Sequence, residues 1–204
     1  FRRVLFRSRT VVAHTPLGSQ LLFKKMLGTE FVSNLFEFNI TLVSKDSNLQ
    51  GKDIIGQPIT LEIDTEVGSP RYLNGLVTDF GYIGEDEDEE DYHAYTCTAR
   101  PFMWYLTQNT DSRVFVDKSV LDITNEVLSP FGFPFQVKCQ KSYRTRGFCV
   151  QYQENSFDFL SRLFEQEGIY YYFTHSNGSH ELVIADDVGI LEAIPSPNIP
   201  YHSK

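Results

Sequence analysis

The sequence predicts a mainly β fold with short helices (α+β): a small antiparallel β-barrel followed by an α/β segment. Before Pro101, apolar and polar residues alternate in several short stretches separated by turn residues, which is typical of half-buried strands. After Pro101 the apolar spacing becomes that of short helices. The 204 residues fit one large or two small domains, and 41% hydrophobic residues is ordinary for a globular chain.

The early strands are predicted from alternation in LFEFNITLVS, which begins at Leu35, and in PITLEIDT, which begins at Pro58. The residues predicted to face inward are Phe36, Phe38, Ile40, Leu42, Ile59, Leu61 and Ile63, and those predicted to face outward include Thr60, Glu62 and Asp64. Two further strands, YLNGLVTDFGYI and YHAYTCTAR, flank the acidic residues 85–91. This acidic run is predicted to be a solvated hairpin tip, because it lacks the glycine and the alternation of a calcium loop. Residues 10–100 are therefore predicted to form the first β-barrel.

The second part, residues 101–204, begins with the aromatic residues FMWY behind Pro101, which predict a short helix or turn. Residues 119–129 are predicted to be a helix, because Ser119 and Asp122 stand at capping-box spacing. Another helix is predicted between Asn155 as N-cap and Gly168 as left-handed C-cap. The apolar residues of the two helices are Val120, Ile123 and Val127 in the first, and Phe157, Leu160 and Phe164, widened by Phe159 and Leu163, in the second. The second helix is predicted to be buried between layers.

The strand IYYYFTH comes next, and Asn177-Gly178 predicts a tight hairpin turn before ELVIA. His175 and His180 flank this turn, so both imidazoles are predicted to lie near an exposed loop. No third ligand accompanies them at a recognisable spacing, so no metal site is predicted. The three cysteines, Cys97, Cys139 and Cys149, contain no C-x-x-C pair and are predicted to be buried free thiols.

Charge and hydropathy exclude two classes of partner. The net charge of -9 argues against a general nucleic-acid binder, because phosphate contacts need clustered Lys and Arg. No stretch approaches the roughly 18 continuous apolar residues of a membrane-spanning helix, and the N-terminus has no secretory signal. We therefore expect a protein that is cytoplasmic at synthesis, with no stable membrane insertion.

Several carboxylates raise the alternative of a glycosidase-type acid/base pair; they are Glu154, Asp158, Glu165, Glu167, Asp186 and Asp187. Such chemistry needs two carboxyl groups about 5 to 10 Å apart across an open cleft. Asp158 already has a structural role at a helix start, and Glu165 and Glu167 fall on the predicted solvent face. The common hydrolase and nucleotide-binding motifs do not occur. The chain is predicted not to be an enzyme, with no catalytic, cofactor-binding or metal-binding residues; a cell-wall hydrolase using Glu165 and Glu167 is the rival hypothesis.

Residues 147–173 resemble the N-terminal region of VgrG proteins, the valine-glycine repeat spikes of type VI secretion, and more distantly the hub of contractile phage tails. The matching motifs are Cys149-Val150-Gln151-Tyr152, Phe157-Asp158-Phe159, Ser161-Arg162-Leu163 and Glu167-Gly168-Ile169-Tyr170-Tyr171. Further matches in the family's order are Leu35-Phe36-Glu37-Phe38, Gly75 with Val77, Arg100-Pro101, Asp111-Ser112-Arg113 with Phe115, Asp117-Lys118-Ser119 and Ala185-Asp186-Asp187. The resemblance covers residues 15–190. It departs at Val116, often Gln in the family, and at the long acidic run.

The resemblance implies a structural part without catalysis or cofactor. In that family a homotrimer presents paired barrels to the hexameric tube protein Hcp, contacts baseplate proteins and carries a needle and secreted effectors. It implies assembly in the bacterial cytoplasm, then secretion without a signal peptide into a target cell or the medium. A tail hub of a contractile phage or phage-derived particle is the alternative within the same class.

Both ends of the chain look unusual for this family. FRRVLFRS resembles a sequencing adapter read through into the reading frame, so residues 1–9 are predicted to be a non-native leader. The Pro-rich end after residue 190 predicts a truncated piece of a longer protein. The resemblance implies that the α/β segment begins a second barrel unit, which is incomplete in this chain.

Overall fold

The structure is a computed structural model that describes residues 11–65 and 68–191. The predicted leader at 1–9 and the predicted Pro-rich connection beyond residue 191 lie outside the described residues. The described strands are β1 (Val11–His14), β2 (Leu22–Thr29), β3 (Glu37–Ser44), β4 (Pro58–Ile63), β5 (Arg71–Glu85), β6 (His93–Arg100), β7 (Thr110–Lys118), β8 (Phe135–Val137), β9 (Arg146–Asn155), β10 (Tyr170–Ser176) and β11 (Ser179–Ala185). The described helices are α1 (Val120–Leu128) and α2 (Ser156–Glu167), with short 3-10 helices η1 (Gly18–Gln20), η2 (Gly51–Asp53), η3 (Phe102–Thr107), η4 (Ser129–Phe131) and η5 (Val188–Ile190).

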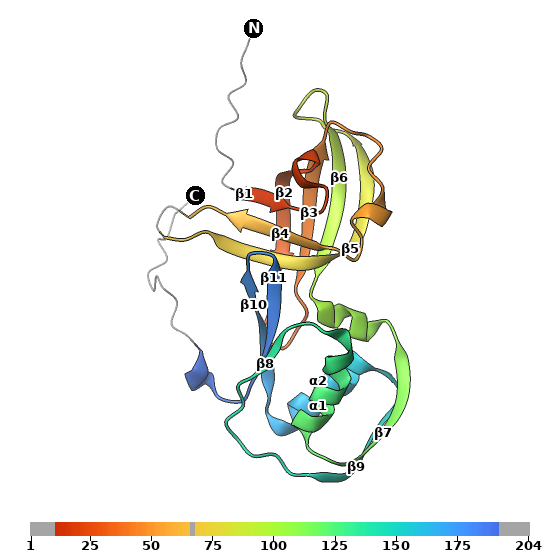
Figure 1. The fold of residues 1–204 in the computed structure, drawn as a ribbon, viewed down its shortest axis with the longest axis vertical. Helices are drawn as coiled ribbons and strands as arrows, with labels where there is room; N and C mark the ends of the chain where they lie inside the picture. Colours follow the sequence, from red (N-terminus) through yellow and green to blue (C-terminus); the bar gives the residue numbers. More distant parts are fainter. Residues whose placement is uncertain (1–10, 66–67, 192–204) are drawn as a thin grey trace.

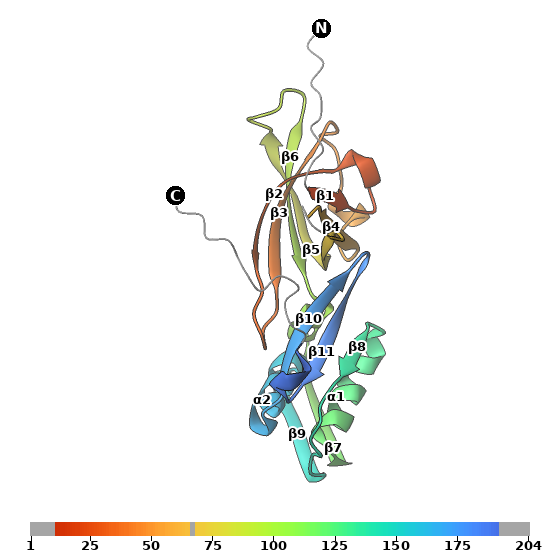
Figure 2. The ribbon, with the colours of Figure 1, turned by 90° about the vertical axis from the view of Figure 1, so that its left-hand side faces the viewer.

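The first six strands form one antiparallel sheet in the order β1-β4-β5-β6-β3-β2. This sheet curls into a half-barrel at one end of the elongated molecule, so that its edge strands β1 and β2 approach each other (Figure 1, Figure 2). β5 turns the corner, because its residues 71–76 pair with β4 and its residues 76–85 pair with β6. A register shift between Val77 and Asp79 lies at this change of partner and sharpens the bend.

The predicted alternation is confirmed in β3 and β4, with one exception. Phe38, Ile40 and Leu42 of β3 are buried, and so are Ile59 and Leu61 of β4. Thr60, predicted to face outward, is only 3% exposed. The reason is that the β10–β11 hairpin lies against β5 beside it, and Asn74 of β5 donates a 2.7 Å hydrogen bond to the Thr60 hydroxyl.

The chain after residue 100 folds at the other end of the molecule (Figure 2). β7 and β9 pair into a two-stranded antiparallel sheet, and α2 packs on one face of it, where the rings of Phe115 and Phe159 stack at 5.4 Å. β10 and β11 form the predicted hairpin, and β8 adds to β11 in parallel. The predicted mainly β fold with short helices is thus confirmed. The division into a first barrel and the start of a second barrel unit at residue 100 stays a prediction.

The helix ends follow their capping residues. Ser119 and Asp122 form both bonds of a capping box at the start of α1. The Asn155 side chain accepts from the Asp158 N–H at 2.7 Å, and Gly168 ends α2 at φ 69°, in the left-handed region that glycine enters without strain. Of the predicted apolar residues of α2, Phe159, Leu160, Leu163 and Phe164 are buried, whereas Phe157 is only half-buried. Among the residues that the structure describes, no helix is long and apolar enough to cross a membrane.

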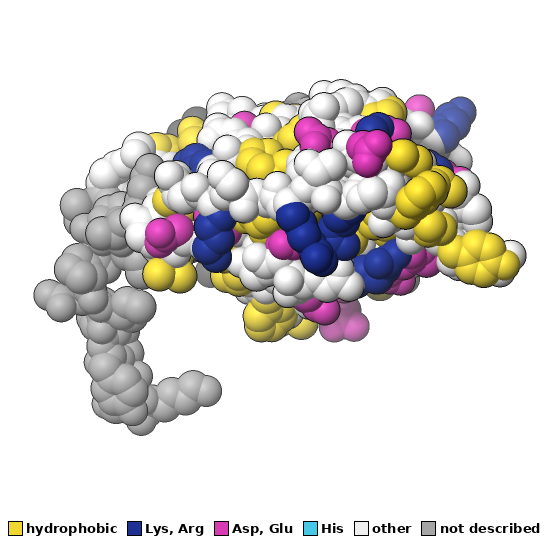
Figure 3. All heavy atoms as spheres, turned by 90° about the horizontal axis from the view of Figure 1, so that it is seen from below, with side chains coloured by type: hydrophobic (Ala, Val, Ile, Leu, Met, Phe, Trp, Pro, Cys, Tyr) yellow, Lys and Arg dark blue, Asp and Glu magenta, His cyan; other side chains and the backbone are white. Residues whose placement is uncertain are grey.

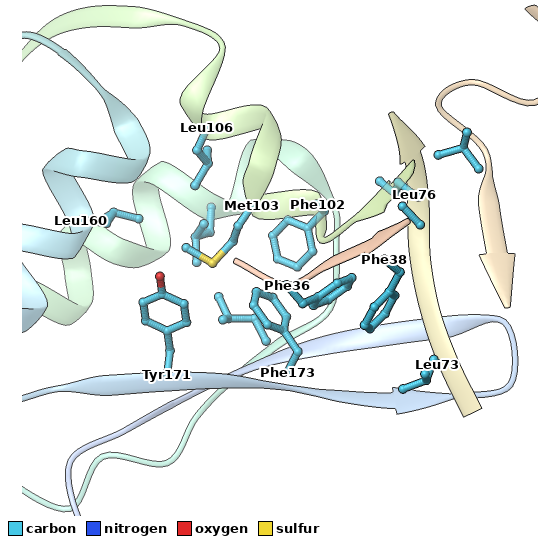
Figure 4. Close-up of a cluster of buried hydrophobic side chains, with 14 of the residues drawn as sticks. Phe36, Phe38, Leu73, Leu76, Phe102, Met103, Leu106, Leu160, Tyr171 and Phe173 are labelled. Carbon is cyan, nitrogen blue, oxygen red and sulfur yellow. The ribbon is translucent and has the colours of Figure 1, made fainter. Parts of the chain in front are cut away.

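One hydrophobic core runs through both ends of the molecule (Figure 4). Phe36, just before β3, meets Phe173 of β10 edge to face at 5.1 Å between ring centroids. Met103 of η3 lies between these rings and the side of the core lined by Leu160 of α2 (Figure 4). The aromatic helix predicted behind Pro101 is therefore the 3-10 helix η3, and it joins the half-barrel to the helices.

Candidate interaction surfaces

The carboxylates weighed as an acid/base pair have separate structural partners. Glu167 forms an ion pair with Arg146 at 2.5 Å. Its side chain is half-buried, so the prediction that Glu167 lies on the solvent face is wrong. Glu154 receives a bidentate bond from Arg162, and these bonds, with its Coulombic attraction, lower the pKa of Glu154 despite its partial burial. Glu165 is exposed on the outer face of α2, as predicted. The placement of these side chains therefore favours ion pairing over a shared reaction centre.

The remaining acidic residues organise the backbone. The Asp158 carboxylate accepts a hydrogen bond from the side-chain NH₂ of Asn155, whose oxygen caps α2. The Asp187 side chain accepts from the N–H of Gly189 at 2.7 Å. Asp186 is buried and accepts from the backbone N–H groups of Gln140 and Lys141. The hydroxyl of Tyr143 donates to the same carboxylate at 2.7 Å. Asp186 thus fixes the loop after β8 against the end of β11.

The outer face of the β7–β9 sheet is apolar and exposed. Val114 pairs with Val150, and Val116 pairs with Phe148, across the ladder. The alternate pair, Phe115 and Cys149, faces the core, so the period of the strands directs these valines and Phe148 outward. Phe148 is 76% exposed, and Tyr152 beyond it is 70% exposed. We call these five residues, Val114, Val116, Phe148, Val150 and Tyr152, the outer apolar face.

Charged pairs stand at both ends of the β7–β9 ladder. Lys118 pairs with Glu126 and Arg146 with Glu167 at one end of the ladder, and Arg113 pairs with Asp111 at the other. In the view from below, this end of the molecule shows hydrophobic side chains next to Lys and Arg side chains (Figure 3). An apolar patch with a polar border is the usual composition of a protein–protein contact.

The acidic residues 85–91 form the predicted solvated tip between β5 and β6, at the far end of the half-barrel (Figure 1). Asp86 is the exception, because its carboxylate is almost fully buried and accepts a 2.6 Å bond from Lys24 of β2. Bonds to Asp86 and Asp88 raise the pKa of Lys24 to about 12 and keep that amine charged. The other carboxylates of the tip leave a strongly negative surface.

Sequence reasoning missed the burial of the two hairpin histidines. His175 and His180 flank the exposed turn at 176–178, as predicted, but their side chains are buried where the β10–β11 hairpin meets the half-barrel. The alternation that located the core strands could have shown this, because His175 continues the inward series of Tyr171 and Phe173, and His180 continues that of Leu182 and Ile184. The prediction instead relied on the turn signal at Asn177-Gly178, which indicates an exposed backbone but not the direction of the neighbouring side chains.

The cysteines largely follow their prediction. Cys97 and Cys149 are buried free thiols, and Cys139 is a half-buried one. Burial raises the pKa of Cys97 to about 12, which keeps this thiol protonated and unreactive at neutral pH.

Comparison with known proteins gives the following likenesses. A family model described as phage tail baseplate hub (GPD) matches residues 29–204. The type VI secretion system spike proteins VgrG1a and VgrG1b of Pseudomonas aeruginosa are 37% and 35% identical to this chain, each over 96% of it. The chain spans only 30% and 26% of their lengths. A solved Escherichia coli protein, c3393, described as a component of the type VI secretion system similar to the T4 tail proteins gp27 and gp5, superposes with TM-score 0.74. That match covers 85% of this chain and 50% of the other at 22% identity, and shows a shared fold.

Proposed function

The chain belongs to the phage tail baseplate hub (GPD) family, and we propose that it is a structural part of a type VI secretion spike. The observation that carries the proposal is the likeness to spike proteins over 96% of the chain. The outer apolar face supports it, because an assembly part uses exposed surface where an enzyme uses a cleft. Under this proposal the carboxylates shape the fold and do not catalyse a reaction.

In the proposed assembly, the complete protein is a homotrimer that docks its barrels on the hexameric Hcp tube. The same particle contacts baseplate proteins and carries a needle and effectors. It assembles in the bacterial cytoplasm and leaves the cell through the secretion machine, without a signal peptide, into a target cell or the medium. The sheet of the half-barrel has two edge strands, β1 and β2. Edge strands suit this role, because neighbouring subunits can cover them.

A secretion assay tests the proposal. Deleting the gene of the complete protein in a strain with an active type VI system should abolish release of the tube protein into the medium, and the wild-type gene should restore it. Phe148→Glu in the complemented strain should reduce release, because it places a charge in the outer apolar face. Glu165→Gln, on the exposed side of α2, is the matched control and should restore release fully. Unchanged release in the deletion strain would contradict the proposal.

The alternative is a tail hub of a contractile phage or phage-derived particle. Two observations support this alternative: the family is described as a phage tail baseplate hub, and c3393 is described as similar to phage tail proteins. Electron microscopy of induced cultures separates the two proposals: loss of tailed particles with intact tube release in the deletion strain would support the phage hub.

The rival hydrolase hypothesis has its own test. The complete protein is incubated with peptidoglycan or chitin, and the same assay is run with Glu165→Gln and Glu167→Gln. We expect no turnover in any sample. Turnover that disappears in either variant, with folding retained, would establish an enzyme.

A further inference from the structure

We propose that the contact between the half-barrel and the β10–β11 hairpin is an acid-releasable joint, in which protonation of His180 frees the hairpin from β5 and η3 while both parts stay folded. This inference does not depend on the proposed function. It rests on a network of side chains that crosses the contact and uses both nitrogens of a buried imidazole.

The ring of His180 is held in one neutral form. Its Nε2 accepts the N–H of Phe102 at 3.0 Å, and its Nδ1 lies 2.8 Å from Oδ1 of Asn74. The Asn74 side-chain NH₂ is already used, because it donates to Thr60 at 2.7 Å. An amide oxygen only accepts, so Nδ1 carries the proton and Nε2 has none. A second proton on Nε2 would oppose the N–H of Phe102 and break this contact.

His175 responds differently to a proton. Its Nδ1 lies 3.1 Å from the backbone N and 3.0 Å from the backbone O of Asn74, on the edge of β5 that β6 does not reach. Its Nε2 lies 3.2 Å from the carboxylate of Glu30. In the neutral ring Nδ1 accepts from the Asn74 N–H; in the charged ring it can donate to the Asn74 carbonyl. His175 therefore keeps partners in both states, and His180 is the proton-sensitive member of the pair.

The surroundings of His180 offer a positive charge little compensation. The rings of Phe36, Phe102 and Phe173 approach it from three segments of the chain, at centroid distances of 5.5, 5.8 and 6.1 Å. The ionisable group facing it is His175, at 6.3 Å, and Glu30 stands behind His175. Burial lowers the pKa of His180 to about 4, and the neighbouring His175 adds to the effect.

The two parts can separate without unfolding, because each has its own backbone ladder. The half-barrel keeps the pairings of β5 with β4 and β6, and the hairpin keeps its pairing from Tyr170 to Ala185. The polar contacts that cross between them come mainly from side chains, together with one backbone bond from Ser33 to the Tyr171 carbonyl at 2.8 Å. The polar bonds between the parts can therefore be lost while both ladders are kept, and the apolar contact of Phe36 with Phe173 is what the released hairpin also has to give up.

The sign and size of the effect follow from proton linkage. The folded joint holds His180 neutral, and an opened joint restores its ordinary value of 6.5. The closed joint is thus fully stabilised above pH 6.5 and loses stability as the pH falls from 6.5 toward 4. With those two values the opening equilibrium rises about eightfold at pH 5.5 and roughly sixtyfold at pH 4.5, relative to pH 7.

Hydrogen–deuterium exchange on the whole chain tests the joint. After correction for the intrinsic rate, the amides whose bonds cross the joint, those of Ser33, Asn74 and Phe102, should lose protection between pH 7 and pH 4.5, while the amides of the β10–β11 ladder and of β3 and β6 keep theirs. His180→Gln cannot titrate and should exchange with the same protection at both pH values. His93→Gln, at the base of the acidic tip, is the matched control and should behave as the wild type.

An NMR titration of the His180 ring covers the case in which His180→Gln does not fold. The ring should stay neutral at pH 5.5 and begin to charge near pH 4. Three results would overturn the joint: protection that is unchanged down to pH 4.5, loss of protection in all strands together, or a His180 ring that titrates near pH 6.5.

Discussion

At the scale of single residues, Asp186 shows how a buried carboxylate is stabilised. Burial acts to raise its pKa, but the bonds from the Gln140 and Lys141 amides and from the Tyr143 hydroxyl outweigh burial, so the pKa lies below its ordinary value. Removing the charge by Asp186→Asn should lower the free energy of unfolding by about 1 to 3 kcal/mol at pH 7. Urea unfolding measures this, with Glu165→Gln on the exposed face of α2 as the control.

The same prediction has a pH dependence with a fixed sign. A carboxylate with a depressed folded pKa stabilises the fold above its unfolded value of 3.8 and loses that contribution as the pH falls below it. The difference between wild type and Asp186→Asn should therefore shrink at pH 3. An equal difference at pH 3 and pH 7 would show that the charge of Asp186 is not the stabilising feature.

Tyr171 gives a prediction of the opposite kind. Its hydroxyl points into the core toward Leu160 and has no hydrogen-bond partner among the described residues, although Ser161 is near enough to offset part of the pKa increase that burial causes (Figure 4). A buried hydroxyl without a partner costs stability, so Tyr171→Phe should leave the free energy of unfolding unchanged or raise it by up to about 1 kcal/mol. A thermal melt beside Tyr143→Phe, which loses a real bond and should destabilise, decides the question. A clear loss in Tyr171→Phe would reveal an unrecognised partner.

At the scale of secondary structure, α2 is the element that the sequence predicted in most detail. Leu160 is fully buried between the β7–β9 sheet and η3, and truncation would leave a cavity there. Leu160→Ala should therefore lower the free energy of unfolding by roughly 2 to 5 kcal/mol. Gln166→Ala, on the exposed side of the same helix, is the control and should change it little. Equal melting midpoints for the two variants would mean that α2 does not depend on its apolar side.

Elements could be predicted where their signals are local. The N-caps of α1 and α2, the Gly168 C-cap and the alternation of β3 depend on residues a few positions apart, and each is found as expected. β7 and β9 are different, because residues 119–145 separate them in the chain and their outer valines break the usual apolar-in, polar-out pattern. Sequence periodicity indicates which residues of a strand share a face, but it does not identify the partner strand.

At the scale of the whole molecule, the relation of the two ends could not be derived from local patterns. Asn74, Phe102, His175 and His180 come from four separate elements, and only the assembled fold brings them into one network. The outer apolar face also appears only once β7 and β9 are paired. Periodicity predicted the fold class and the family resemblance gave the assembly hypothesis, whereas these two features required the structure.

The last prediction concerns the state of association. We expect the complete protein to be a trimer and this 204-residue chain to be monomeric or loosely associated at micromolar concentration. The outer apolar face has five side chains, which can cover a few hundred Å² at most, whereas a stable interface buries about 800 Å² on each partner. Association also costs several kcal/mol of translational and rotational freedom, so contacts of this size leave a weak affinity.

Sedimentation velocity over a concentration series measures that state. Wild type should shift gradually toward larger species as concentration rises, and Phe148→Glu should shift less, because a charge at this 76% exposed position opposes burial of the outer apolar face. Glu165→Gln should sediment as wild type. A sharp trimer peak at all concentrations would place the trimer interface within this chain. A trimer that persists in Phe148→Glu would further show that the interface lies outside the outer apolar face, with the edge strands β1 and β2 as the next surfaces to test.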